Sequence, residues 1–162
     1  MAMIYYITQI QFDFGAIAML KAECLRTGIT RPLLITDAGV KAAGIVQKAL
    51  DALPGLPVVV FDQTPSNPTE AAVRAAAAVY VANDCNGLIA VGGGSSIDCA
   101  KGVAIAATHP GPLSHYATIE GGAPRITASV APLIAVPTTS GTGSEVARGA
   151  IIIVDDHRKL GF

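Results

Sequence analysis

The chain has 162 residues, of which 51% are hydrophobic and 14% are charged, and its formal net charge at pH 7 is −1. This length and apolar content are sufficient for one packed domain. With so few charges and no run of Lys or Arg, the sequence supports neither a nucleic-acid partner nor an anionic membrane surface. Its longest apolar stretches are of strand length, so no membrane span is expected.

The N-terminal sequence lacks the basic region and the long apolar region of a signal peptide. Cys24, Cys85 and Cys99 show no metal-ligand spacing, and we expect them to be reduced and mostly buried. Together these features predict a cytoplasmic protein.

Strand-like and helix-like segments alternate in the first half of the chain. The apolar periodicity predicts, in order, an extended segment at 3–10, a helix at 16–28 ending on Gly28, a strand at 31–36, one helix that starts near Asp37 and stops before Pro54, and a strand at 57–61. A turn-rich loop at 62–68 precedes a helix that opens on Thr69 and extends to residue 84.

The alternation continues in the second half. We expect a strand at 87–92, a helix at 95–109, a loop rich in Gly and Pro at 111–129, a strand at 131–137, a polar loop at 138–146 and a last strand at 149–156. Strands joined through helices predict a doubly wound, mostly parallel, Rossmann-like α/β sheet with helices on both faces. Because no closing helix follows the last strand, we expect the chain to be the front part of a longer protein.

Four polar loops follow the predicted strands, at 37–39, 62–68, 92–96 and 138–145. In a doubly wound sheet, ligands bind beyond the carboxyl ends of the strands. The loops are rich in Gly, Ser, Thr, Asn and Asp, so the sequence predicts a ligand cleft at that edge of the sheet.

The loop of three glycines at 92–94, followed by Ser95 and Ser96, has two interpretations. Glycines let the backbone approach an anion at the N-terminus of the next helix, which favours a phosphate site. Alternatively, Ser95 and Asp98 form a capping box in an ordinary strand-to-helix turn. The loop matches neither common phosphate-binding fingerprint, so by itself it leaves both interpretations open.

Two side chains in the earlier loops also have a ligand-binding and a local interpretation. Asp37 is placed to accept hydrogen bonds from a ribose, which would favour NAD over NADP, or it caps the following helix. Asn67 could bind a nucleotide, although an Asx turn before Pro68 is the interpretation that local chemistry favours.

The hydroxyl-rich loop at 138–145 favours a ligand wall made of Thr138, Thr139 and Thr142, with Glu145 orienting these groups or capping a short helix. The three histidines of the chain, at positions 109, 115 and 157, have no spacing typical of a metal site. No Ser/His/Asp nucleophile set can be assembled. The residues therefore predict a ligand cradle rather than a catalytic centre.

The motifs "ITDAGV", "SNPT", "GGGSSIDCAK" and "PTTSGTGSEV" occur in this order. In this combination the sequence resembles the iron-containing (group III) alcohol dehydrogenase family over nearly its whole length. The resemblance implies that residues 1–162 are a dinucleotide-binding domain, followed in the family by a helical domain that holds Fe²⁺ or Zn²⁺. It also implies hydride transfer between a nicotinamide cofactor and a small alcohol or aldehyde.

The resemblance assigns the cofactor site residue by residue. Asp37 would hold the adenosine ribose of NAD, NADP being the less expected cofactor, and Asn67 would line the cleft. The remaining residues would surround the pyrophosphate and the nicotinamide side: Gly93, Gly94, Ser95, Asp98, Thr138, Thr139, Thr142, Ser144 and Lys159. For Lys159 the alternative is a solvated lysine in a polar turn.

The family's metal ligands, an Asp and three His of the helical domain, have no counterpart in this sequence. We therefore expect the chain alone to lack dehydrogenase activity. A homodimer formed through the first extended segment is a further expectation from the resemblance. Alternatives are a maleylacetate reductase or another enzyme of the same superfamily, or a non-catalytic nucleotide-binding module.

Overall fold

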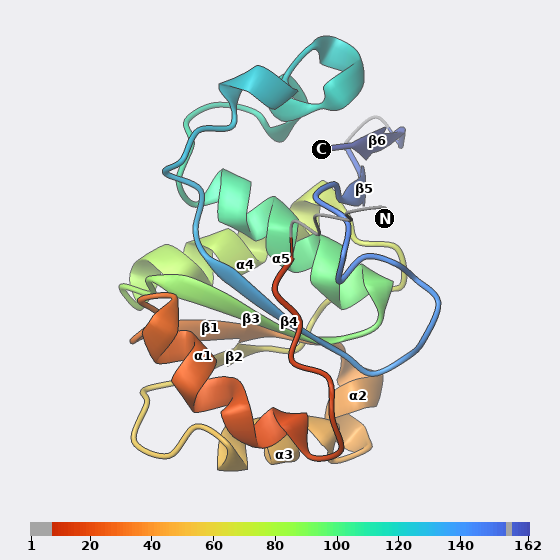
Figure 1. Cartoon of the computed structure of the whole chain (residues 1–162). Coiled ribbons are helices and arrows are strands. Elements are labelled where there is room, and N and C mark those ends of the chain that lie inside the picture. The colour runs from red at the N-terminus through yellow and green to blue at the C-terminus, as the bar shows by residue number, and fades with distance from the viewer. Residues whose placement is uncertain (1–7, 155–156) are drawn as a thin grey trace, which may run out of the picture.

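A four-stranded parallel sheet forms the centre of the computed structural model, which describes residues 8–154 and 157–162 (Figure 1). The order of its strands is β2-β1-β3-β4, and every neighbouring pair is parallel. The strands are β1 (Pro32–Ile35), β2 (Val59–Phe61), β3 (Gly87–Gly92) and β4 (Leu133–Pro137). All four lie within segments predicted as strands, because each is a short, nearly continuous apolar run.

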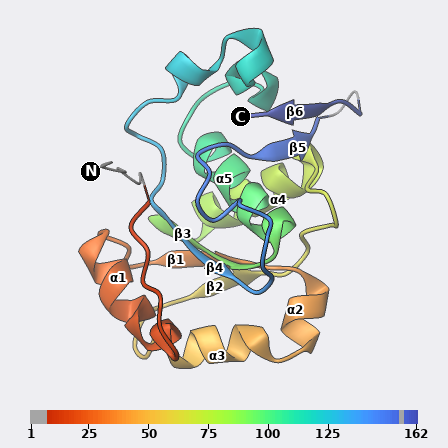
Figure 2. The same ribbon diagram turned by 45° about the vertical axis from the view of Figure 1, so that its right-hand side comes forward.

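Helices cover both faces of this sheet, as predicted (Figures 1 and 2). On one face lie α1 (Leu20–Arg26) and α3 (Ile45–Asp51), and on the other lie α4 (Glu70–Ala82) and α5 (Gly94–Ala106). The α/β doubly wound architecture expected from the sequence is therefore confirmed.

The strand residues alternate between two separate apolar cores. Leu33 and Leu88 pack with the residues of α4 and α5, whereas Leu34 and Ile89 pack with those of α1 and α3. This alternation follows from the two-residue period of a strand, which sends successive side chains to opposite faces of the sheet. Both faces of the sheet are thus covered by apolar contacts.

The prediction of a single helix that starts near Asp37 and stops before Pro54 is wrong. The chain forms two helices, α2 (Ala38–Ala42) and α3, separated at Gly44. Gly44 has a φ of 73°, in the left-handed region that glycine adopts at little cost. The break therefore comes from one backbone conformation that the apolar periodicity does not reveal.

The predicted last strand is the first half of a hairpin. β5 (Ile151–Ile153) pairs antiparallel with β6 (Lys159–Gly161), apart from the parallel sheet. The hairpin packs on α5 at Gly102, where an added Cβ would lie 2.6 Å from Ile152 Cδ1. Short 3-10 helices complete the fold: η1 (Ala16–Met19), η2 (Leu113–Tyr116), η3 (Thr118–Glu120) and η4 (Ala123–Arg125).

Several expectations concern buried groups and termini. Cys24, Cys85 and Cys99 are buried free thiols, as predicted. Most of the extended segment predicted at 3–10, and residues 155–156 of the predicted last strand, lie outside the described residues. Among the helices of the described chain, none has the length and apolar character needed to cross a membrane.

Candidate functional site

The carboxyl ends of β1 and β3 are neighbours, but the chain leaves them in opposite directions across the sheet. β1 leads to β2 on one side, and β3 leads to β4 on the other. Such a reversal is the topological switch point at which doubly wound sheets bind ligands. Asp37 follows β1 and Gly93 follows β3, so two of the predicted site residues lie at this switch point.

Asp37 joins the two loops at the switch point. Its Oδ1 accepts a hydrogen bond from the Val40 N–H at 2.9 Å, which makes it the N-cap of α2, as the local interpretation predicted. Its Oδ2 accepts a hydrogen bond from Ser96 Oγ, in the first turn of α5, at 3.2 Å. Because each carboxylate oxygen has a second lone pair, Asp37 keeps the capacity to accept from a ligand hydroxyl.

The N-terminus of α5 offers unpaired donors at this switch point. Its N-cap is Gly93, which has no side chain to close the helix end, and the helix is 13 residues long. Within the described residues, no acceptor is found for the N–H groups of Gly94, Ser95 and Ser96. Free N–H groups and the positive end of the helix dipole suit a phosphate group.

The predicted capping box of Ser95 and Asp98 is wrong, because α5 begins one residue before Ser95. Ser95 Oγ instead accepts a hydrogen bond from the Asn67 N–H at 3.1 Å. The buried Asp98 accepts the Ile151 N–H on Oδ2 at 2.9 Å, so its carboxylate holds the start of β5.

The glycine loop and the hydroxyl loop are in close contact. A Cβ added at Gly94 would lie 3.1 Å from Ser144 Oγ and 3.2 Å from Thr142 Cβ. A Cβ added at Gly93 would lie 3.3 Å from Thr139 Cγ2. Glycine at both positions therefore lets the hydroxyl side chains approach the first turn of α5 without displacement.

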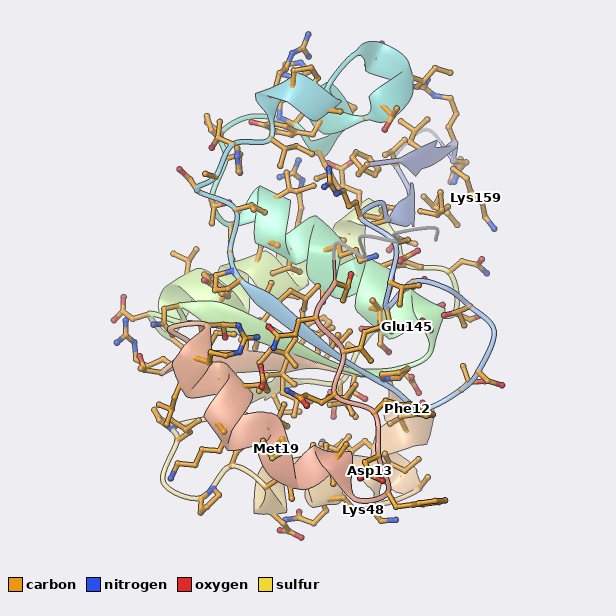
Figure 3. The ribbon with its side chains drawn as sticks, viewed as in Figure 1. Phe12, Asp13, Met19, Lys48, Glu145 and Lys159 are labelled. Atoms are coloured by element: carbon orange, nitrogen blue, oxygen red, sulfur yellow. The ribbon has the colours of Figure 1, made fainter. Side chains whose placement is uncertain are left out.

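The hydroxyl loop is ordered by its own hydrogen bonds. The Thr138 N–H donates to the Gly92 carbonyl at 3.0 Å and so extends the register between β3 and β4. Thr142 Oγ1 donates to Glu145 Oε2 at 3.2 Å and accepts the Ser144 N–H at the same distance. Glu145, labelled in Figure 3, thus orients a hydroxyl, one of the two roles considered for it.

Lys101 is a residue that sequence reasoning missed. Its ammonium donates to the carbonyl oxygens of Ser144, Ala147 and Gly149 at 2.6, 2.8 and 2.7 Å, and it lies 3.9 Å from Asp98 Oδ1. Burial lowers the pKa of Lys101. A lysine within the apolar, largely buried sequence of α5 is the signal that could have revealed it.

Asn67 and Lys159 are brought together although they are far apart in the sequence. Lys159, labelled in Figure 3, lies on β6, and its Nζ donates to Asn67 Oδ1 at 2.9 Å. The predicted Asx turn is therefore wrong, because the Asn67 amide oxygen binds the lysine and the residue has a φ of 59°. Lys159 lies in a strand and not in a polar turn. Through Ser95, this pair is linked to the N-terminus of α5.

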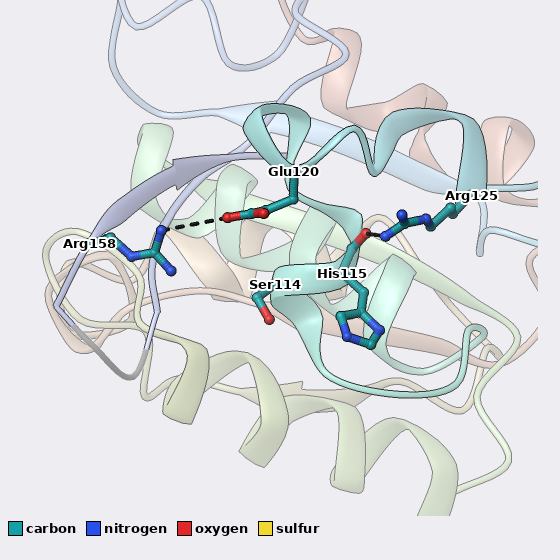
Figure 4. Close-up of a pocket in the computed structure, with 5 residues that line it drawn as sticks. All are labelled: Ser114, His115, Glu120, Arg125 and Arg158. Atoms are coloured by element: carbon teal, nitrogen blue, oxygen red, sulfur yellow. Dashed lines mark hydrogen bonds and ion pairs between the residues drawn. The ribbon is translucent and has the colours of Figure 1, made fainter.

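Two shallow pockets lie at the surface. One, of about 300 Å³, is lined mainly by apolar residues of η1, α3, β3 and β4, and by Lys48 and Thr138. The other, of about 320 Å³, is lined by Ser114, His115, Glu120, Arg125 and Arg158 (Figure 4). In the second pocket Arg158 lies 3.7 Å from Glu120, and none of the predicted site residues contributes to it.

The histidines do not assemble a metal site. Among the described residues, no group of three His, Cys, Asp or Glu is placed to hold a metal ion. His109 is hydrogen-bonded to Thr108 and Thr127. The described residues therefore fit the pyrophosphate of a dinucleotide at α5, but they do not fit a metal.

The family model for iron-containing alcohol dehydrogenases matches residues 8–162. The chain belongs to the iron-containing alcohol dehydrogenase family. The family expected from the four sequence motifs is thus confirmed. The positions of the individual cofactor ligands stay predictions.

Similar proteins from this family extend well beyond the matched part. The chain is 71% identical over 162 residues to 4-hydroxybutyrate dehydrogenase of Cupriavidus necator, and 40% identical over 154 residues to 1,3-propanediol dehydrogenase of Klebsiella pneumoniae. The two matches cover 100% and 91% of this chain, but only 42% and 38% of the length of the respective relatives.

A solved structure of the family carries a nicotinamide cofactor. It is sulfoacetaldehyde reductase from Bifidobacterium kashiwanohense in complex with NAD⁺, with a TM-score of 0.86 and 27% sequence identity. The match covers 99% of this chain and 43% of the reductase. The chain therefore spans about two-fifths of the length of the family members that it matches.

Proposed function

We propose that this chain is the NAD-binding segment of a metal-dependent alcohol dehydrogenase. The observation that carries the proposal is the convergence of two loops at the switch point. There, the unpaired N–H groups at the start of α5 face a loop of hydroxyl side chains. A dinucleotide pyrophosphate needs this combination of backbone donors, small side chains and a helix N-terminus.

In this proposal each group has a defined task. The N–H groups of Gly94 and Ser95 bind the pyrophosphate, together with Ser96, and Gly93 keeps the approach open. Thr138, Thr139, Thr142 and Ser144 flank the pyrophosphate and the nicotinamide side. Lys159 adds a positive charge that its hydrogen bond to Asn67 holds at this edge. Asp98 acts through the hairpin that it anchors rather than on the cofactor.

We further propose that the cofactor is NAD rather than NADP. The Asp37 carboxylate accepts hydrogen bonds from ribose hydroxyls, and its negative charge repels a 2′-phosphate. Its two hydrogen bonds, with Val40 and Ser96, hold the carboxylate at the switch point beside the start of α5.

The reaction proposed for the whole enzyme is the oxidation of a primary alcohol. The hydroxyl-bearing carbon gives a hydride to the cofactor and the hydroxyl oxygen loses a proton, which leaves an aldehyde. The family's metal supplies polarisation of the substrate oxygen, and we place it outside the described residues. The 71% identity to a 4-hydroxybutyrate dehydrogenase supports an alcohol that also carries a carboxylate as the substrate.

Three further expectations remain proposals. Residues 1–162 form one dinucleotide-binding domain, the enzyme is a homodimer, and it is cytoplasmic. The three buried free thiols support a reducing compartment. Size-exclusion chromatography with light scattering tests the dimer.

Titration of the chain with NADH, measured by isothermal titration calorimetry, tests the proposed function. We expect saturable binding with one site per chain and weaker binding of NADPH. Absence of binding by a folded chain, or a preference for NADPH, would contradict the proposal. The chain alone is expected not to oxidise alcohols, and a spectrophotometric assay with NAD⁺ checks this.

A further inference from the structure

Arg148 is one of only two cations in the described part of the chain that have no partner there. Every described lysine and arginine donates to or pairs with a protein group, except Lys48 and Arg148. Lys48 lies on α3 and lines the mainly apolar pocket, on the other face of the sheet from α5. Arg148 is exposed and follows the hydroxyl loop of the candidate site.

The backbone that carries Arg148 is held against α5 along one face of the helix. Gly94, Asp98 and Lys101 have the spacing of a helix face, and each contacts the segment 144–151. Lys101 binds the carbonyls of Ala147 and Gly149, the two residues on either side of Arg148. The position of Arg148 is therefore fixed on both sides, although the residue has no regular secondary structure.

This position lies close to the proposed cofactor site. Lys101 is seven residues beyond Gly94, which corresponds to two helical turns, or about 10 Å along the axis of α5. The same segment begins at Ser144, whose hydroxyl contacts the pyrophosphate-binding turn. Arg148 thus lies on the segment that continues from the hydroxyl loop of the proposed site along α5, and its guanidinium has no partner among the described residues.

We propose that Arg148 recognises the carboxylate of an ω-hydroxy acid substrate and is a specificity-determining residue. The inference rests on the proposed function, and it names the residue that selects this substrate class. A guanidinium binds a carboxylate through two parallel hydrogen bonds. Because Lys101 already orders the backbone, substrate binding needs to order little more than the Arg148 side chain.

A chimaera tests this inference. In it, this chain replaces the stretch that it matches in the C. necator dehydrogenase, which supplies the rest of the enzyme. The kcat/KM values for 4-hydroxybutyrate and for 1-butanol, an uncharged alcohol of the same length, are compared. We expect Arg148→Leu to lower kcat/KM about 10- to 100-fold for 4-hydroxybutyrate, the scale of a charge-assisted hydrogen-bond pair, and to leave 1-butanol nearly unchanged.

Two further variants and a binding measurement sharpen the test. Arg148→Lys should restore part of the preference, since it keeps the charge but loses the two-pronged geometry. Arg26→Leu, at an exposed arginine of α1, is the matched control and should leave kcat/KM unchanged for both substrates. Calorimetry of 4-hydroxybutyrate with the NADH-loaded chimaera should show the same loss of affinity for Arg148→Leu.

The outcomes separate the inference from the proposed function. An Arg148→Leu chimaera that binds NADH normally and keeps its preference for 4-hydroxybutyrate overturns the inference alone. Equal losses for both alcohols also overturn it, because they indicate a structural role. A folded chimaera that binds no NADH contradicts the proposed function, and the inference then falls with it.

Discussion

Asp37 combines a structural and a proposed functional role in one side chain. Replacement by Ser keeps an N-cap for α2 but removes the charge at the switch point. We expect Asp37→Ser to weaken NADH binding and to strengthen NADPH binding, shifting the ratio of the two dissociation constants about tenfold, the effect of ~1.4 kcal/mol. Parallel titrations measure this ratio. Asp51→Ser, on α3, is the control, and an unchanged ratio in Asp37→Ser would refute the role.

The buried thiols make stability depend on pH. Burial raises the pKa of Cys24 and of Cys99 from 9.0 to about 11. The folded chain therefore keeps thiol protons that the unfolded chain loses above pH 9, so this contribution to stability is full below pH 9 and declines as the pH rises toward 11. Urea unfolding at pH 8 to 10 should show a smaller decline for Cys99→Ala. Equal slopes in the two proteins would contradict this account.

Lys101 fixes the loop at 144–149 to α5 through three carbonyl groups. Lys101→Met should leave these oxygens without their donor and destabilise the chain by about 2 kcal/mol. Hydrogen exchange should accelerate in the loop more than in α4, and NADH affinity should fall. Lys48→Met removes a lysine without a partner among the described residues and serves as the control. If exchange in the loop is unchanged, Lys101 does not order it.

The elements were predictable to different degrees for physical reasons. The strands are continuous apolar runs between Gly, Pro and polar residues, and burial on both faces of the sheet demands such runs. The break at Gly44 could not be predicted, because a glycine within a periodic helix pattern does not by itself indicate a left-handed φ. The capping box failed for a related reason, since the start of a helix is uncertain by one or two residues.

At the scale of the whole molecule, the sequence predicts which loops meet but not how they are held. Four polar loops after parallel strands must share one edge of the sheet, and the structure places them there. The bond between Lys159 and Asn67, and the bond between Asp98 and Ile151, depend on a hairpin that folds back over α5. Contacts between such distant residues follow from the tertiary fold, and local patterns carry no signal for them.

The central claim is that the N-terminus of α5 and the loop at 138–145 form the cofactor site. Amide chemical shifts of the ¹⁵N-labelled chain, recorded during titration with NADH, test this claim most directly. We predict that the largest shifts occur at Gly93, Gly94, Ser95 and Ser96 and at residues 138–145, with smaller ones near Asp37. Saturable shifts confined to other surfaces, such as the pocket of Ser114 and Arg125, would contradict the claim.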